Sequence, residues 1–276
     1  MSSPISLKER QRRYAGLIVR FGVNLQAGQG LVISYEPVAR EFANLLVVEA
    51  YKAGAKHVHL DCDDPLARHA RLAHIKPEHL EYVPEYEVAR RDQYVDETWA
   101  RIAITSQEFP QLFDDIDASL MARSQTARAT KLKRYTEAMM STRFQWCVVA
   151  VPTRSWARQV FPKLPAALGV AKLWDLVLRT VRADESNPAA AWAVHDECLK
   201  KVSAYLATQR VTGVHFFDPV PADDGAPSTD LRIGLTDSSV WIAASSTTPN
   251  DVSFMANMPT EEVFTSPHRM KTEAQL

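Results

Sequence analysis

The stretch Leu31 to Leu60, LVISYEPVAREFANLLVVEAYKAGAKHVHL, decides the fold of this chain. It opens with a short apolar run, Leu31–Ser34, that predicts a buried strand. Pro37 stands near the start of an amphipathic helix, and Gly54 is placed to end it. Lys56–Leu60 predicts a second strand. Two strands joined by one helix through short connections are typical of a parallel sheet, so the predicted fold class is α/β.

The segments on both sides of this unit extend the same pattern. Apolar residues within Leu7–Phe21 share one helical stripe, and Gly22 is well placed to end that helix. Arg101–Thr105 and Trp146–Val151 are two further strand candidates. We therefore expect residues 1–185 to form an N-terminal α/β domain, with a Rossmann-like, open, mostly parallel sheet and helices on both faces.

The pattern changes in the last third of the chain. Asn187-Pro188 is typical of a helix start, and the helix is expected to continue to about Ala207. Three short strands are predicted after it, at Val211–Phe217, Asp230–Leu235 and Val240–Ala244. The first two are separated by a loop rich in turn residues: Pro219, Pro221, Asp223, Asp224, Gly225 and Pro227. Residues 186–276 are therefore predicted to begin a second, more strand-rich domain.

Composition limits the classes of partner. The chain has 276 residues and a formal net charge of −1, which gives no reason to expect nucleic acid or an anionic membrane as a partner. No apolar run is long enough to span a bilayer, and residues 1–8 lack the apolar core of a signal peptide. The three cysteines, Cys62, Cys147 and Cys198, form no CxxC pair, so a reducing cytoplasm is the expected location.

Residues 257–268, NMPTEEVFTSPH, hold the strongest candidate for a chemical site. The flanking Pro259 and Pro267 keep the backbone out of a helix. The segment between them can run extended, and Glu261 and Glu262 then point to opposite faces. Adjacent carboxylates can bind a divalent metal and activate a water beside it. An exposed acidic turn is the simpler alternative that the spacing leaves open.

This stretch resembles the PTEEVFT signature of the thermophilic metal-dependent aminopeptidases, peptidase family M29, which includes aminopeptidases T, S and PepS. Four further blocks resemble the family in the same order along the chain: Tyr14–Gln29, Glu49–Lys56, Val149–Pro162, and Asp230–Leu231 with Trp241. Two departures leave the metal ligands in place: Ser228 stands where the family has Gly, and Ala243-Ala244 stand where glycines usually follow the Trp. Because the blocks keep their order, chance does not explain the agreement.

The resemblance implies a two-metal hydrolase that removes N-terminal residues from peptides and uses zinc, cobalt or manganese. It makes Glu261 a metal ligand and Glu262 the catalytic general base or a support for that ligand, with the reverse assignment left open. His268 is a weaker candidate to line the site. The expected partner is a peptide substrate, and a homodimer is left open.

Members of this family are longer than this chain, and most of their metal ligands, histidines and an Asp among them, lie in the further part. The resemblance therefore implies that residues 186–276 begin the catalytic domain of a C-terminally truncated form. Two adjacent carboxylates cannot supply two catalytic sites, since a catalytic zinc normally takes three protein ligands. The contrasting hypothesis is a catalytically inactive α/β module that binds peptide or oligomerises.

Other candidates have simpler structural explanations. His57, His59, Asp61 and Asp63 alternate along the second predicted strand and would share a face. Such a row rarely converges on one ion, so we expect it to mark the polar end of a strand; a true site would lie at the carboxyl edge of the sheet. The turn Tyr35–Arg40 contains no glycine, so NAD, ATP and S-adenosylmethionine are not expected as cofactors.

The patterns GxSxG and HExxH are absent from the sequence, which excludes two common hydrolase sites. His195 lies inside a predicted helix and is expected to be a surface or groove histidine. The basic residues of Ser119–Arg143 are expected to form a solvated helical face. Four tryptophans are assigned to the core or to grooves: Trp156, Trp174, Trp192 and Trp241.

Overall fold

The computed structural model describes residues 5–221 and 227–275. Contacts divide the chain into two compact units. The first comprises Met1–Ala191 and Ser245–Pro259, and the second comprises Trp192–Ala244 and Thr260–Leu276. The division expected from the sequence treated each domain as one continuous segment, whereas residues 245–259 return to the first unit.

The first unit is built on a five-stranded sheet with the order β10-β4-β3-β1-β2. Its strands are β1 (Gly30–Tyr35), β2 (His57–Cys62), β3 (Ala100–Thr105), β4 (Trp146–Ala150) and β10 (Asn257–Met258). All neighbouring strands run parallel. The first four lie where the sequence predicts them. A hairpin of β8 (Ser245–Thr247) and β9 (Ser253–Met255) precedes β10. The sequence predicted neither this hairpin nor β10.

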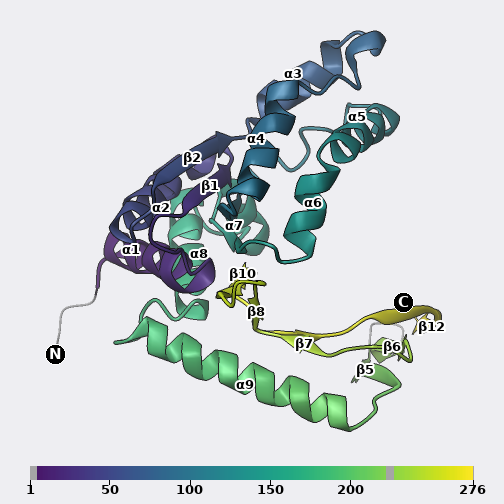
Figure 1. Cartoon of the computed structure of the whole chain (residues 1–276). Helices are drawn as coiled ribbons and strands as arrows, with labels where there is room; N and C mark the ends of the chain where they lie inside the picture. The colour runs from purple at the N-terminus through teal and green to yellow at the C-terminus, as the bar shows by residue number, and fades with distance from the viewer. Residues whose placement is uncertain (1–4, 222–226, 276) are drawn as a thin grey trace. The chain divides into compact units, whose positions relative to one another are not determined.

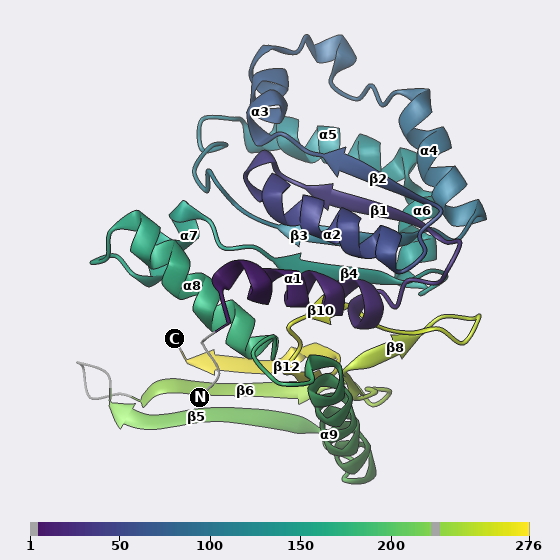
Figure 2. The same ribbon diagram turned by 90° about the vertical axis from the view of Figure 1, so that its left-hand side faces the viewer.

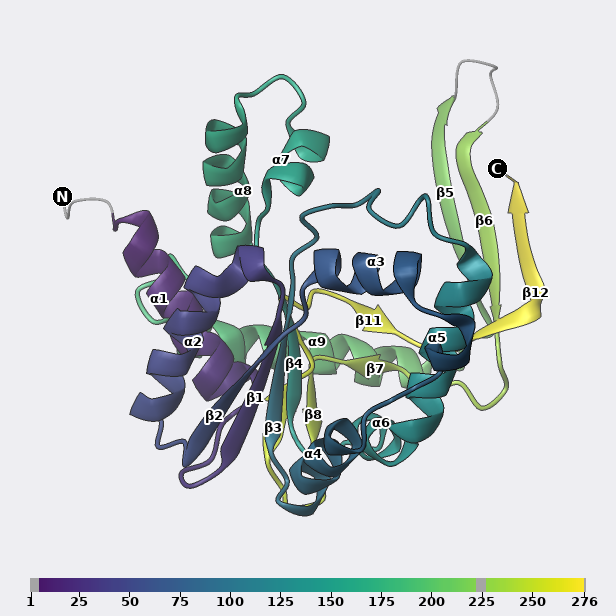
Figure 3. The same cartoon turned by 90° about the horizontal axis from the view of Figure 1, so that it is seen from above.

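Helices cover both faces of this sheet (Figure 1), as the sequence predicts. In Figure 2, α1 and α2 lie in front of the strands, and Figure 3 shows α4 and α6 on the opposite side. The helices of this unit that precede α9 are α1 (Leu7–Leu17), α2 (Arg40–Lys52), α3 (Pro65–His74), α4 (Glu85–Asp96), α5 (Ala118–Lys131), α6 (Lys133–Met140), α7 (Arg154–Val160) and α8 (Ala166–Thr180), with short turns of other helix types at η1 (Ile18–Gly22), η2 (Pro37–Ala39) and η3 (Pro77–His79). Gly54 follows α2 with φ +94°, the left-handed conformation that ends a helix.

The two faces of the sheet are buried by different side chains. Ile33 and its register partner Ile102 are fully buried on the face toward α1 and α2. On the same side, the Tyr14 hydroxyl donates a hydrogen bond of 2.8 Å to the Met258 carbonyl. The opposite face carries Val32 within a largely aromatic cluster: Tyr94, Val95, Trp99, Tyr135, Ala138 and Phe144. Because both faces are covered, β1 and β4 are nearly continuous apolar runs, which made them visible in the sequence.

The second unit contains antiparallel strands and most of helix α9 (Pro188–Thr208). One sheet has the order β12-β6-β5, with β5 (Gly213–Pro221), β6 (Pro227–Leu235) and β12 (Pro267–Gln275). A second pairs β7 (Ile242–Ala243) with β11 (Val263–Phe264). The predicted helix and strands are present, but β7 is shorter than the predicted Val240–Ala244. Residues 222–226 of the predicted loop lie outside the described residues.

Candidate metal site around Glu261

The acidic pair lies in an irregular segment of the second unit, directly ahead of β11. Only Val263 and Phe264 form a strand, so the extended run expected over Thr260–Thr265 is shorter than predicted. β11 pairs with β7, and the Thr265 hydroxyl donates to the Val240 carbonyl at 2.8 Å, which fixes the segment to its neighbour. As the sequence predicts, this segment is not helical.

Glu262 turns back toward its own backbone. Its carboxylate accepts a hydrogen bond of 2.8 Å from the amide of Glu261, and its side chain is exposed. A carboxylate has about four lone-pair positions, so this bond leaves others open for a proton or a water. The contact holds Glu262 beside Glu261 and gives the two carboxylates different surroundings.

Glu261 faces a histidine from helix α9. His195 Nε2 lies 3.3 Å from Glu261 Oε2 and 2.8 Å from the carbonyl oxygen of Thr260. The His195 side chain is only 13% exposed, whereas that of Glu261 is 46% exposed. Trp192, one turn earlier on α9, is fully buried and meets the imidazole edge-on with ring centroids 5.4 Å apart. The ring is therefore held in place while the carboxylate reaches solvent.

The contact with Thr260 restricts the protonation of His195. A carbonyl oxygen can only accept, so Nε2 carries a hydrogen when this bond forms. In the neutral ring, Nδ1 then holds the lone pair that can bind a metal or accept a proton. In the protonated ring, Nε2–H also pairs with the Glu261 carboxylate. Because Nε2 is the ring nitrogen that faces Glu261, the pair shares a proton in this arrangement. It can share a metal ion only when Nε2 gives up its hydrogen and its bond to Thr260.

The donor atoms suit a divalent transition metal, but they are too few for a complete site. Imidazole nitrogen and carboxylate oxygen are ligands that zinc, cobalt and manganese accept in proteins. Within residues 5–221 and 227–275, no group of three or more His, Cys, Asp or Glu side chains is arranged to hold a metal. Glu261 and His195 therefore fit part of a coordination set, since a catalytic zinc takes three protein ligands.

His268, the weaker candidate, lies on β12. Its Nδ1 atom is buried without a hydrogen-bond partner, and its carbonyl accepts a bond of 3.0 Å from the Thr272 hydroxyl. An unpaired imidazole nitrogen keeps His268 a candidate to line the site, although no described contact joins it to the acidic pair.

The histidine and aspartate row on β2 serves a structural role. Arg90 reaches both His59 Nε2, at 3.1 Å, and Asp61 Oδ1, at 3.2 Å, while Arg91 contacts the other oxygen of Asp61. Burial, and then the charge of Arg90, lower the pKa of His59. Because guanidinium groups already occupy these donor atoms, the row is an ion-pair network, in line with the simpler expectation.

The basic residues of α5 and α6 also pair with acids on the surface. Arg123 contacts Glu81 at 2.8 Å and Arg134 contacts Asp92 at 3.2 Å, while Arg128 contacts Glu87. This is the solvated helical face expected from the sequence. Cys62, Cys147 and Cys198 are free thiols.

Nearly the whole chain, including the acidic segment, matches one known protein family. A family model described as Thermophilic metalloprotease (M29) matches residues 7–275. The chain belongs to the M29 metalloprotease family. The resemblance stated from the sequence motifs is therefore confirmed, and M29 membership covers both units of the chain.

This M29 chain is similar to several aminopeptidases over nearly all of its own length. It is 33% identical to aminopeptidase AmpS of Bacillus subtilis over 96% of this chain and 62% of the relative. It is 31% identical to aminopeptidase T of Thermus thermophilus over 97% of this chain and 64% of the relative. The solved structure of wild-type AmpT from Thermus thermophilus matches with a TM-score of 0.83 at 30% identity, covering 98% of this chain and 64% of that one. The chain thus spans less than two-thirds of the length of these relatives.

In the described part of this M29 chain, every helix is too short or too polar to cross a membrane.

Proposed function

We propose that this chain contributes to a metal-dependent aminopeptidase, an exopeptidase that hydrolyses N-terminal residues of peptides at a site with two divalent ions. The observation that carries the proposal is the 3.3 Å contact between His195 of α9 and Glu261, which belongs to the PTEEVFT segment. The aminopeptidases that match over both units support the substrate class. Zinc, cobalt or manganese is the proposed cofactor.

In this proposal Glu261 and His195 hold one metal ion. A divalent ion supplies a water that loses its proton near neutral pH and a positive charge beside the peptide carbonyl. Glu262 is the general base: its carboxylate is exposed, lies beside Glu261 and keeps unused lone pairs. The hydrogen bond from the Glu261 amide holds the Glu262 carboxylate beside the Glu261 backbone. Metal binding by the Glu261→Gln and Glu262→Gln variants distinguishes this assignment from the reverse one, in which Glu262 is the ligand and Glu261 the base.

The ligand count predicts how much of this activity the 276 residues provide by themselves. Two donors leave a zinc ion with an incomplete coordination set, so a metal-bound water would not be held in place. We expect weak metal binding and little or no hydrolysis by this chain. A joined protein, in which the remaining part of Thermus thermophilus aminopeptidase T follows Leu276, should be active.

The test measures hydrolysis of leucine and alanine anilides by the chain and by the joined protein, each with added zinc, cobalt or manganese and with a chelator. Metal-dependent turnover by the joined protein alone supports the proposal. Rapid metal-dependent turnover by the 276-residue chain would contradict the ligand count, and a joined protein that folds but stays inactive would contradict the proposed function.

A further inference from the structure

The topology of the first unit creates a place for a ligand that the proposed function does not use. The sheet order β10-β4-β3-β1-β2 puts β1 between β2 and β3. The chain leaves β1 toward one edge of the sheet and returns to build the other edge through β3. In open parallel sheets, the carboxyl ends of the two strands at this point border a crevice in which small molecules bind.

A hollow of about 680 Å³ lies at this position. Most of its lining comes from residues at the carboxyl ends of β1, β3 and β4 and from the turns that follow them. Arg101 joins the lining from the start of β3, and Asp63 joins it from the turn after β2. Small side chains form its floor: Ser34 is the register partner of Ala103, and Thr105 is that of Ala150. Hollows of roughly 300–1,000 Å³ are typical of sites for small molecules.

Two buried polar atoms in this hollow have no hydrogen-bond partner. They are Glu36 Oε2 and Ser106 Oγ. Ser106 is only 5% exposed, so bulk water does not readily satisfy its hydroxyl. Buried polar groups in folded proteins are nearly always hydrogen-bonded, so two open atoms in one cavity point to a ligand that supplies the missing partners.

The hollow also brings together opposite charges. Burial raises the pKa of Glu36, while the Glu108 amide and Arg68 act in the opposite direction. Arg101 is half-buried, and its described hydrogen bond goes to the thioether of Met139 at 3.8 Å. Burial lowers the pKa of its guanidinium. Asp63, also in the lining, is paired with Arg68 at 2.9 Å. Glu36 therefore offers an acceptor for a cationic group, and Arg101 offers donors for an anionic one.

We propose that this hollow binds a small zwitterion, an amino acid or short peptide whose ammonium group meets Glu36 and whose carboxylate meets Arg101. The Ser106 hydroxyl completes the polar contacts, and the partly buried Trp156 gives an apolar wall for the ligand side chain. A nucleotide fits poorly, because the turn at Glu36 has no glycine and its carboxylate repels phosphate. The inference does not depend on the proposed peptidase site.

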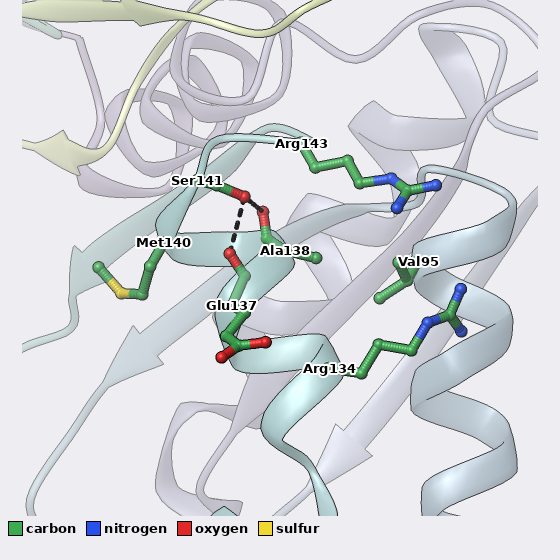
Figure 4. A pocket seen from close by; sticks show the side chains of 7 residues that line it. All are labelled: Val95, Arg134, Glu137, Ala138, Met140, Ser141 and Arg143. Atoms are coloured by element: carbon green, nitrogen blue, oxygen red, sulfur yellow. Dashed lines mark hydrogen bonds between the residues drawn. The ribbon is translucent and has the colours of Figure 1, made fainter.

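A second hollow of the same unit lacks the unpaired buried polar atoms of the first. It lies between α4 and α6 and has a volume of about 620 Å³ (Figure 4). Two of its polar groups have partners: the Ser141 hydroxyl donates to the Glu137 carbonyl at 2.7 Å, and Arg134 pairs with Asp92 and Asp96. None of the residues that line this second hollow has a buried side-chain polar atom without a hydrogen-bond partner.

The test uses calorimetry on the full 276-residue chain carrying Glu261→Gln, without metal, so that binding is separated from hydrolysis. The probe is leucylglycine, compared with its N-acetyl and C-terminal amide forms. We expect one molecule of leucylglycine per chain and an affinity about tenfold lower for each capped form, as for loss of one charge-assisted contact. The capped ligands test the inference without altering the protein.

Two variants then assign the contacts. Glu36→Gln should weaken leucylglycine binding but not N-acetyl-leucylglycine binding, and Arg101→Met should weaken leucylglycine binding but not binding of the amide. Ser106→Ala gives a milder loss if Arg101→Met fails to fold, and Arg134→Met at the other hollow is the matched control. No binding at millimolar peptide, equal binding of capped and free forms, or binding of ADP or phosphate in place of peptide would overturn the inference.

Discussion

Two histidine and carboxylate pairs in this molecule lead to different conclusions. His59 and Asp61 lie two residues apart on β2, with Nε2 and Oδ1 4.0 Å apart, and belong to the first unit. His195 and Glu261 are far apart in sequence, yet their side chains approach to 3.3 Å in the second unit. The pair that is adjacent in sequence is the less suitable one for a metal.

The difference comes from what surrounds each carboxylate. Arg90 and Arg91 of α4 occupy both oxygens of Asp61, whose side chain is 21% exposed. Glu261 keeps 46% of its side chain exposed beside the His195 imidazole, which is 13% exposed. A metal at Asp61 would have to displace two guanidinium groups, whereas nearly half of the Glu261 side chain faces solvent. Partners brought by other elements therefore decide which pair forms an ion-pair network and which we propose as a metal site.

The largest expected effect separates the roles of the two glutamates. In the joined protein, Glu261→Gln and Glu262→Gln should each lower kcat/KM for a leucine anilide by about 100-fold or more, as for loss of a ligand or a base. Glu261→Gln should also weaken metal binding, and Glu262→Gln should not. Glu197→Gln on the exposed side of α9 is the control. Full activity in both variants would sink the site assignment, and the opposite metal result would exchange the two roles.

Metal affinity tests the comparison of the two pairs directly. Titration of the 276-residue chain with zinc should show weak binding that His195→Gln lowers by about 10-fold to 100-fold. His59→Gln should leave the affinity unchanged, because Arg90 already occupies that histidine. A larger loss from His59→Gln than from His195→Gln would reverse the conclusion drawn from the two environments.

For stability, the order of the two carboxylates should be reversed: removing Asp61 should cost more than removing Glu261. Asp61→Ala leaves Arg90 and the nearly buried Arg91 without their shared carboxylate, and should lower the free energy of unfolding by about 1–3 kcal/mol. Glu261→Ala removes a half-exposed group and should change it by no more than about 0.5 kcal/mol. Urea unfolding of both variants measures the contrast, and equal losses would show that the Asp61 network has no special structural weight.

The smallest effect concerns a structural acid in the first unit. Hydrogen bonds from Lys56, Trp99 and Gln93, in that order of strength, lower the pKa of Glu97 to about 2 from the ordinary 4.5. Because the folded-state pKa is lowered, the stabilisation is present above pH 4.5 and is lost as the pH falls toward 2. The urea midpoint of Glu97→Gln should therefore lie below that of the unmodified chain at pH 6 and converge with it near pH 2. A difference that persists unchanged at low pH would contradict this assignment.

Most of the first unit could be predicted because its signals are local. Short apolar runs marked β1 to β4, and Pro37 and Gly54 marked the ends of the helical segment between the first two strands. β10 escaped prediction, since Asn257 and Met258 form a strand only through their parallel pairing with β4. The strand β12 was not predicted either, because its pairing with β6 depends on long-range contacts.

The candidate site was predictable only in part. The motif around Glu261 and Glu262 pointed to the two acids, but nothing in the local pattern of α9 connected His195 to them. The signal that existed was the spacing of His195 three residues after Trp192, which places both on one side of the helix and aims the imidazole inward. Which segment it meets there depends on the fold of the whole second unit.

The central claim is that Glu261 and His195 bind one divalent ion together. The most direct measurement is anomalous X-ray diffraction from crystals of the 276-residue chain soaked in zinc or manganese. We predict a peak within about 2.0–2.3 Å of a Glu261 carboxylate oxygen and a His195 ring nitrogen, the range of zinc–ligand distances. A peak at Asp61 and His59, or no peak at Glu261 at millimolar metal, would contradict the account.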